Sequence, residues 1–341
     1  MDRTVNSLLV VHPGSLGDTI LALPVLAALK ERHHPASLHL IGHPSLVDVL
    51  PGRTVIDAMH SIEGPQYREL LGGSERMRPA MVEFFRPFGL IVVWAADHTG
   101  SVRATLECLG ISRVVVRSPG LREDTNQHAT DRFRGTVEDL LPTEELPESG
   151  LTPTENDRRS GARWLLTHGI DPESEHIIAV HAGSGSVSKC WPSDRFAVVI
   201  RALLRHRIRV VLIQGPADEE MTQAVARQVP VSLPRLRNAS LATVVGVLSI
   251  CDGFLGNDSG ITQLATASGM PTVAVFGPTD PRIWGYRHKR LVPLRAEKAC
   301  GCTTREAQQT CNGRVCLATS PAVVLNALRP LIRSAGRSLA T

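Results

Sequence analysis

Short apolar runs alternate with amphipathic segments along the first half of the chain. The pattern predicts strands over 7–12, 38–42, 90–94 and 114–117, and a helix over 18–33. The strands are continuous apolar runs bounded by turn residues, whereas the helix ends in a polar and basic stretch. Strands that alternate with helices form parallel sheets with crossover connections. The first half is therefore predicted to be a doubly wound α/β domain.

The same alternation resumes after residues 141–153, a stretch rich in Pro, Thr, Glu and Ser that is typical of a linker. The pattern there predicts strands over 176–181, 209–214, 253–256 and 272–276, and helices over 156–168, 193–206, 218–228, 241–249, 259–268 and 321–332. Ser193 or Asp194 is expected to cap the helix over 193–206. The fold class is α/β, with two Rossmann-like domains whose parallel sheets face one another across a cleft.

Composition supports two ordinary globular domains. The chain has 341 residues, of which 43% are hydrophobic and 21% charged, which excludes a disordered, collagenous or coiled-coil protein. The net charge, 37 basic minus 33 acidic residues or +4, is compatible with anionic substrates and too small to indicate nucleic acid. No targeting or membrane-spanning segment is recognised, so we expect a cytoplasmic monomer whose membrane contact is at most peripheral, at the inner membrane face.

A glycine-containing turn joins the first predicted strand to the first predicted helix. Gly14 and Gly17 allow the backbone to approach a ligand closely, and the start of the helix offers free N–H groups to an anion. Asp18 is then either a carboxylate directed at the ligand or a cap of the helix. The turn, with Ser15 between the glycines, is neither a G-x-G-x-x-G nor a Walker A loop, so NAD binding and ATP hydrolysis lose their usual support.

Two further loops of this kind occur in the second half. The loop over 181–192 carries Ser184, Gly185 and Lys189, which can bind phosphate oxygens and neutralise a diphosphate. The loop over 256–260 leads into a helix of small residues, which Asp258 or Ser259 is expected to cap. Each loop alone could be a plain connection, but three of them exceed what helix capping requires.

Together these motifs resemble glycosyltransferase family 9, the ADP-heptose:lipopolysaccharide heptosyltransferases. The resemblance is carried, from residue 8 to about 330, by Gly14 to Asp18 with Leu23-Pro24, Gly183 to Pro192, Gly215 to Asp218, and Asp258 to Ala265 with Pro271 to Thr279. It implies a GT-B architecture with an N-terminal acceptor-side domain over 1–150, a nucleotide-sugar-binding domain over 151–318, and a C-terminal segment over 319–341 whose helix packs back on the N-terminal domain.

The resemblance also implies an inverting transfer that needs no metal and no cofactor. Asp18 matches the family's general base, Lys189 matches the lysine that stabilises the departing diphosphate, and Asp218 lies near an acidic position that contacts the nucleoside. The remaining matches are the donor- and phosphate-binding residues Ser184, Gly185, Asp258, Ser259, Gly260 and Gln263, and the acceptor-side loop residues Gly14, Ser15 and Gly17. The chain departs from the family pattern at Gln263, where histidine is common, and at His12, where arginine is common.

The function implied is transfer of a sugar, heptose, from a nucleotide-diphospho-sugar such as ADP-heptose to a saccharide or glycolipid acceptor of the cell envelope. Two alternatives stay open. One is a GT-B enzyme that transfers another sugar to a small molecule or a protein. The other is a non-catalytic homologue that binds nucleotide sugars.

Four of the seven cysteines cluster near the C-terminus, at Cys300, Cys302, Cys311 and Cys316. Four thiolates suit a tetrahedral zinc ion, but the spacing lacks the paired C-x-x-C of typical zinc sites. Reduced thiols are the favoured interpretation, because the cytosol disfavours disulfides. A structural metal or a disulfide-stabilised loop is the alternative.

Overall fold

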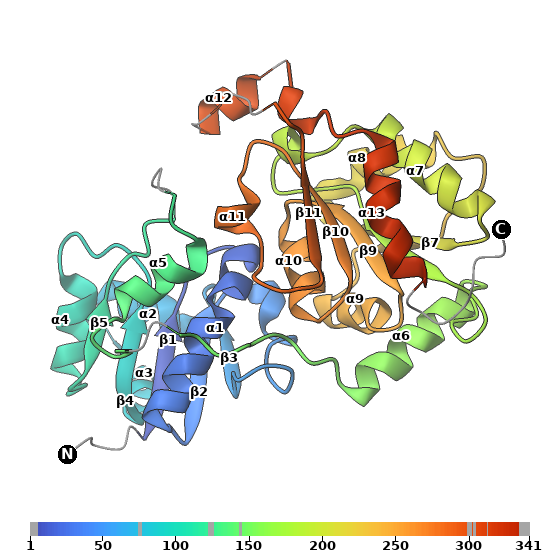
Figure 1. Ribbon diagram of the computed structural model, residues 1–341. Coiled ribbons are helices and arrows are strands. Elements are labelled where there is room, and N and C mark those ends of the chain that lie inside the picture. Colours follow the sequence, from blue (N-terminus) through green and yellow to red (C-terminus); the bar gives the residue numbers. More distant parts are fainter. Residues whose placement is uncertain are drawn as a thin grey trace. The chain divides into compact units, whose positions relative to one another are not determined.

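The computed structural model describes residues 6–73, 77–121, 126–142, 145–298, 302, 305–311 and 313–333. The chain divides into two compact units, residues 1–151 and 152–341. This boundary lies one residue from the predicted one. Each unit is a parallel sheet with helices packed on it (Figure 1).

The N-terminal unit holds a five-stranded sheet of order β3-β2-β1-β4-β5 in which every pairing is parallel. Its strands are β1 Ser7–Val11, β2 Ser37–Gly42, β3 Ala58–Ser61, β4 Phe88–Val93 and β5 Val114–Val116. Its helices are α1 Leu16–His33, α2 Pro65–Gly72, α3 Pro79–Phe85, α4 Ser101–Cys108 and α5 Ala129–Thr136. Because β1 lies between β2 and β4, the loop after β1 lies at the point where the strand order reverses, which is where α/β sheets bind ligands.

The buried strand β1 and helix α1 hold this loop firmly. Leu9 and Val11 pack in one apolar cluster with Ile91 and Val93 of β4. Helix α1 is buried over most of its length, so its weak amphipathic pattern reflects a helix enclosed by protein rather than one lying on the surface.

The C-terminal unit holds a six-stranded sheet of order β11-β10-β9-β6-β7-β8, again entirely parallel. Its strands are β6 Ile177–His181, β7 Arg209–Gln214, β8 Arg235–Arg237, β9 Gly253–Asn257, β10 Thr272–Phe276 and β11 Leu291–Arg295. Its helices are α6 Glu155–Thr167, α7 Ser193–Arg205, α8 Glu219–Ala226, α9 Leu241–Leu248, α10 Gly260–Ala267, α11 Pro281–Trp284, α12 Arg305–Thr310 and α13 Pro321–Arg333. Here β6 lies between β7 and β9, so the loop after β6 occupies the same topological position as the loop after β1.

Helices α6 and α9 of this unit cross at very close range. A Cβ atom on Gly161 would lie 2.0 Å from the carbonyl oxygen of Gly246, so the crossing requires glycine at residue 161. The contact fixes the first helix of the C-terminal unit against the helix that leads into β9, whose end carries candidate site residues.

Two helices of the C-terminal unit bear on expectations from the sequence. Helix α13 contacts α7, β9 and β10, and its Val324 and Leu328 are buried in the core of the C-terminal unit (Figure 1). The helix thus buries its apolar face within that unit, and its expected packing on the N-terminal domain stays a prediction. The predicted N-cap of α7 is wrong. The helix begins at Ser193 with Pro192 as its N-cap residue, so Ser193 and Asp194 lie in its first turn.

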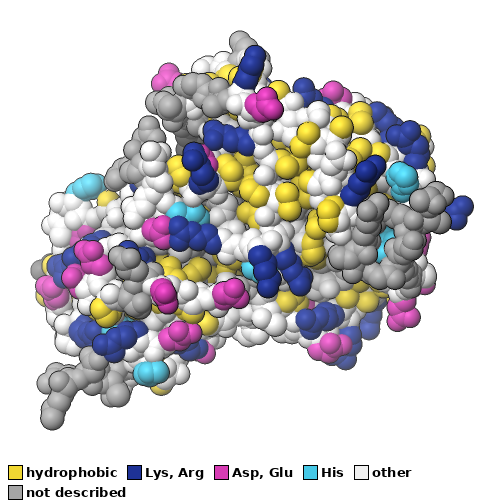
Figure 2. Space-filling view, in the orientation of Figure 1, with side chains coloured by type: hydrophobic (Ala, Val, Ile, Leu, Met, Phe, Trp, Pro, Cys, Tyr) yellow, Lys and Arg dark blue, Asp and Glu magenta, His cyan; other side chains and the backbone are white. Residues whose placement is uncertain are grey.

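The surface carries charges of both signs. In the face drawn in Figure 2, basic and acidic side chains are interspersed, with hydrophobic side chains between them over the C-terminal unit. That face therefore lacks the single-sign field of a nucleic-acid-binding surface. Within the described ranges, none of the helices has the length and apolar character needed to span a membrane.

Candidate active site

The loop after β1 ends in a capping box. The Ser15 backbone N–H and hydroxyl donate to Oδ2 of Asp18 at 3.1 and 2.8 Å, and the Asp18 N–H donates to the Ser15 hydroxyl at 3.3 Å. Asp18 therefore does cap α1, as one of the two sequence interpretations required. Both bonds to the carboxylate engage Oδ2, and in the described part of the chain Oδ1 takes no hydrogen bond. The carboxylate is thus held in a fixed orientation with one oxygen available.

His12 lies directly under this loop. Its side chain is 3% exposed and packs edge-on against Trp94 and Phe133, with ring centroids 5.8 and 5.1 Å away. Burial lowers the pKa of His12 to about 4, although the negative charge of Asp18 acts in the opposite direction. A Cβ on Gly14 would lie 2.3 Å from the imidazole, so the glycine makes room for the ring.

In the C-terminal unit, the polar residues gather at the carboxyl ends of the strands. His181 at the end of β6 pairs with Gly256 of β9, so the loops after these two strands lie next to each other. The Asn257 side chain ties them together, because its Nδ2 donates to the Ala182 carbonyl at 2.7 Å and its Oδ1 accepts from the Trp191 N–H at 2.9 Å.

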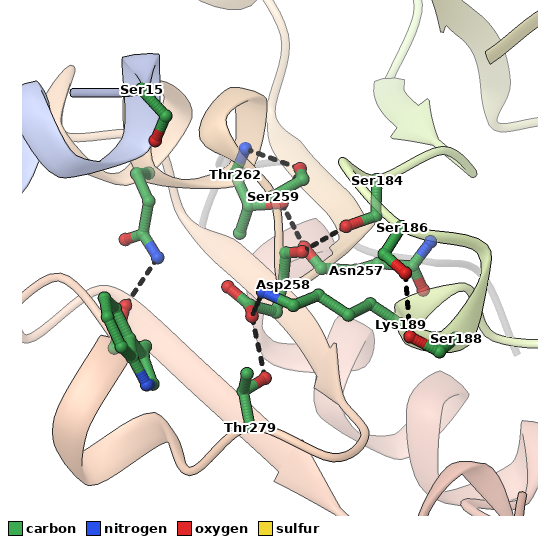
Figure 3. Close-up of polar contacts among 12 residues, drawn as sticks. Ser15, Ser184, Ser186, Ser188, Lys189, Asn257, Asp258, Ser259, Thr262 and Thr279 are labelled. Atoms are coloured by element: carbon green, nitrogen blue, oxygen red, sulfur yellow. Dashed lines mark hydrogen bonds and ion pairs between the residues drawn. The ribbon is translucent and has the colours of Figure 1, made fainter. Parts of the chain in front are cut away.

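Lys189 projects from the first of these loops to the second (Figure 3). Its Nζ lies 2.7 Å from Oδ2 of Asp258, and the Thr279 hydroxyl donates to the same oxygen at 2.7 Å. Ser184 donates to the Asp258 backbone carbonyl at 2.6 Å. The Lys189 side chain remains 28% exposed whereas that of Asp258 is 7% exposed, so Lys189 is the more accessible partner of the ion pair.

Ser259 caps helix α10 by accepting a hydrogen bond from the Thr262 N–H at 3.2 Å, and Gly260 is the first residue of the helix. The N-terminal amides of α10 therefore begin beside Asp258 and Lys189. Such an end carries partial positive charge and unpaired N–H groups, which suit a phosphate. The exposed Gly185 has nothing within 4 Å of an added Cβ, so the backbone is open at that point.

Asp218 and Gln263 have protein partners of their own. Asp218 Oδ2 lies 2.9 Å from Nε2 of His181 and accepts from the Gly215 N–H at 3.0 Å. Gln263 is buried, donates to the Trp284 carbonyl at 2.6 Å and accepts from the Tyr286 N–H at 2.9 Å. Both side chains hold neighbouring segments in place, and their contacts with a donor stay predictions.

The cysteine cluster is only partly described. Cys300 lies outside the described residues, and no disulfide joins Cys302, Cys311 and Cys316 to one another. The Arg314 N–H and the Cys302 side chain hydrogen-bond Cys311 and lower its pKa, whereas Cys316 is buried in the core. Among the described residues, no group of three or more His, Cys, Asp or Glu side chains could hold a metal ion.

Three residues of this arrangement are not among the predicted site residues: His181, Asn257 and Thr279. Asn257 directly precedes the predicted Asp258, and Thr279 ends the Phe276-Gly277-Pro278 turn after β10. The signal for Thr279 and Asn257 was their place at the carboxyl end of a predicted strand. The role of His181 required the structure, because its partners are 37 and 78 residues away.

Comparison with known proteins gives the family. The sequence model of glycosyltransferase family 9 (heptosyltransferase) matches residues 117–319, more than half of the chain. The chain belongs to glycosyltransferase family 9. Among relatives, lipopolysaccharide heptosyltransferase 3 of Escherichia coli K12 is 21% identical over 290 residues, covering 79% of this chain and 81% of the relative. The family-9 chain described here is accordingly a glycosyltransferase.

Solved structures of the family share its fold. The E. coli ADP-heptose lps heptosyltransferase II superposes with a TM-score of 0.73 at 16% identity. The superposition covers 97% of this chain and 100% of that structure. The E. coli heptosyltransferase WaaC with ADP gives a TM-score of 0.63 at 17% identity, covering 95% and 99%. These likenesses confirm the predicted GT-B fold class of this family-9 enzyme.

Proposed function

We propose that this glycosyltransferase moves heptose from ADP-heptose to a saccharide acceptor of the cell envelope. The observation that carries the proposal is the partly exposed Lys189 side chain beside the amide end of α10, within a chain of this family. The names of the relatives, lipopolysaccharide heptosyltransferases among them, support both the donor and the class of acceptor.

In this proposal the C-terminal unit binds the donor. Lys189 neutralises the diphosphate, and the Ser259 hydroxyl and the backbone amides at Ser184, Gly185 and Gly260 donate hydrogen bonds to its oxygens. Asp258 supports the site from below: with Thr279 it holds the Lys189 side chain in place before the donor arrives. Asp218 lies near the nucleoside of the donor in this proposal, and Gln263 lies near its phosphates.

Asp18 acts as the general base in the proposed reaction, on the acceptor side, with the loop residues Gly14, Ser15 and Gly17 around the acceptor. Its carboxylate takes the proton of the acceptor hydroxyl while the oxygen attacks the anomeric carbon opposite the diphosphate. The bond from that carbon to the diphosphate oxygen breaks, ADP leaves with the electron pair, and the configuration inverts. The lysine and the helix amides stabilise the departing charge, so no metal is needed.

A thermal-shift panel with ADP, UDP, GDP and TDP tests the donor assignment. A ligand at about 100 times its dissociation constant adds ~2.7 kcal/mol to the unfolding free energy. We expect ADP to give the largest stabilisation of the four nucleotides. In a separate transfer assay, we expect the enzyme to form product from ADP-heptose and an envelope saccharide. A larger shift with UDP, GDP or TDP would move the enzyme to another donor, and no shift with any of them would contradict the proposed donor site.

A further inference from the structure

A buried chain of hydrogen bonds connects three loops at the carboxyl edge of the C-terminal sheet. His181 lies in its middle, with Nε2 at 2.9 Å from Oδ2 of Asp218 and Nδ1 at 3.2 Å from Oγ of Ser259. The three residues are 2%, 8% and 8% exposed, respectively. The chain therefore runs from an enclosed carboxylate to the hydroxyl group that caps α10.

The carboxylate end of this chain fixes one proton of the imidazole. Burial would raise the pKa of the Asp218 carboxyl, but the hydrogen bonds that it accepts from His181 and from the Gly215 N–H outweigh burial and keep this pKa below its ordinary value. Asp218 is thus ionised at neutral pH and can only accept. Nε2 of His181 must carry a hydrogen, and the state of Nδ1 is the one variable that is left.

The state of Nδ1 decides where the Ser259 hydroxyl proton points. Ser259 Oγ accepts from the Thr262 N–H and lies 3.1 Å from the Thr262 hydroxyl, whose own proton goes to the Asn257 carbonyl. When Nδ1 is unprotonated, it accepts a hydrogen bond from the Ser259 hydroxyl, whose proton then points toward His181. When Nδ1 carries a proton, it donates to Oγ of Ser259. The Ser259 hydroxyl can then donate its own proton to an acceptor that is not part of this series of hydrogen bonds, such as a ligand.

We propose that His181 is a positioning residue that takes up a proton when a nucleoside diphosphate binds, so that the Ser259 hydroxyl turns its own proton to a phosphate oxygen. The inference rests on the proposed function, which brings the diphosphate to the start of α10. One proton moves from solvent to Nδ1, no covalent bond to the ligand forms, and Asp218 balances the charge of the imidazolium. A neutral hydroxyl contact thereby becomes one linked to a positive charge, which suits a diphosphate.

Other titratable groups beside this chain do not supply that proton. Burial, followed by the charge of Asp218, raises the pKa of the Cys190 thiol to about 11, so the thiol stays neutral. Lys189 and Asp258 pair with each other at 2.7 Å, so their charges offset before the ligand arrives. The change of charge on ligand binding is therefore assigned to His181 in this proposal.

Calorimetric titration of ADP into the full chain, in two buffers of different ionisation enthalpy at about pH 8, measures the protons taken up on binding. At this pH an ordinary imidazole is mostly neutral. Asp218→Asn keeps an oxygen to accept both hydrogen bonds but removes the charge that balances the imidazolium. We expect the wild type to take up about one proton more per ADP than Asp218→Asn, and to bind ADP about tenfold more tightly. Proton exchange by ADP itself is common to both proteins and cancels in the difference.

Asp252→Asn is the matched control. Asp252 follows the same design at the other end of β6, because its Oδ2 accepts from the Ile177 N–H at 2.7 Å and lies 3.4 Å from Nδ1 of His176. It is remote from the proposed phosphate site along the strand. This variant should match the wild type in both proton uptake and ADP affinity.

Ser259 variants give a second, independent test that does not depend on how Asp218→Asn folds. Ser259→Ala should abolish the extra proton uptake, and Ser259→Thr, which keeps a hydroxyl, should restore it. Equal proton uptake by the wild type and by both Asp218→Asn and Ser259→Ala, with ADP bound, would overturn the role of His181 and leave the proposed function standing. Failure of the wild type to bind ADP would overturn both.

Discussion

The two units place a histidine at the same topological position and surround it differently. His12 follows β1 and His181 ends β6, each at the reversal of strand order and each two residues before a glycine. His181 has a polar partner at both ring nitrogens, whereas both nitrogens of His12 are buried without a hydrogen-bond partner in the described chain. The same scaffold thus carries a hydrogen-bonded imidazole in one unit and an uncharged aromatic support in the other.

Gly14 and Gly183, the glycines that follow the two histidines, show how the space around each imidazole is used. An added Cβ on Gly183 would lie 1.9 Å from Oδ1 of Asp218, and one on Gly14 would meet the His12 ring itself. In the C-terminal unit the missing side chain admits a carboxylate beside the loop that we propose to bind phosphate. In the N-terminal unit it lets an apolar-packed ring lie under the loop that carries Asp18. We infer that the C-terminal unit is built to hold an anion and the N-terminal unit to hold a base in place.

Substitution of Asp18 is expected to have the largest effect on turnover. Asp18→Asn should lower turnover about 10² to 10⁴-fold while ADP affinity stays within about twofold, because a positioned base acts on the reaction and not on the donor. Initial rates of ADP release and calorimetric ADP binding measure the two quantities.

Asp157 provides the control for helix capping. With Thr154 it forms the same capping box at the start of α6, where the Thr154 hydroxyl and N–H donate to its Oδ2, each at 2.7 Å. Asp157→Asn should cost about 0.5 to 2 kcal/mol of stability and leave turnover per folded molecule unchanged. Turnover of Asp18→Asn within a fewfold of wild type would reduce Asp18 to a helix cap.

Lys189 is expected to have the next largest effect, this time on donor binding. Lys189→Ala should weaken ADP binding by about 1.5 to 3 kcal/mol, the value of a lost charged hydrogen bond, and lower turnover further. Lys30→Ala is the control, because Lys30 pairs with Asp57 at the same 2.7 Å in the N-terminal unit. Equal ADP affinity in wild type and Lys189→Ala would show that the ammonium group does not contact the diphosphate.

His12 should affect the pH dependence of stability. Its pKa is near its ordinary 6.5 in the unfolded chain and about 4 in the folded one, so the unfolded chain binds the proton first as the pH falls. The unfolding free energy should therefore drop by about 2 to 3 kcal/mol more between pH 7 and about pH 4.5 in the wild type than in His12→Leu. Denaturant titrations at the two pH values measure this difference, and parallel losses in both proteins would mean that His12 is solvated.

The smallest expected effect is that of metal removal. Added EDTA should leave turnover unchanged, because Lys189 and the amides of α10 meet the charge of the departing diphosphate. Loss of activity that returns with Mg²⁺ or Mn²⁺ would assign part of that role to a cation.

The alternation of apolar runs and helices was sufficient to predict the two sheets and the three loops. Strands such as β1, β7 and β10 are continuous buried runs, and their positions agree with prediction to within a residue. The short edge strands β3, β8 and β11 were missed, since partly exposed runs such as Arg235–Arg237 lack that apolar signal.

The contacts between side chains required the structure. Sequence placed Lys189, Asp258 and Ser259 in loops that parallel strands bring to one edge, but nothing in the sequence pairs Lys189 with Asp258, 69 residues away. The amphipathic pattern of α13 likewise predicts an apolar face without saying which surface covers it. Such long-range choices depend on shape complementarity in the folded core, which no local pattern records.

Hydrogen–deuterium exchange of the full chain with and without saturating ADP tests the central claim, that the C-terminal unit holds the nucleotide and the N-terminal unit supplies the base. We predict slower exchange with ADP in peptides that cover 183–190 and 258–263, and a smaller change or none in those that cover 12–18. Protection confined to the 12–18 loop, with the C-terminal loops unchanged, would contradict this division of roles.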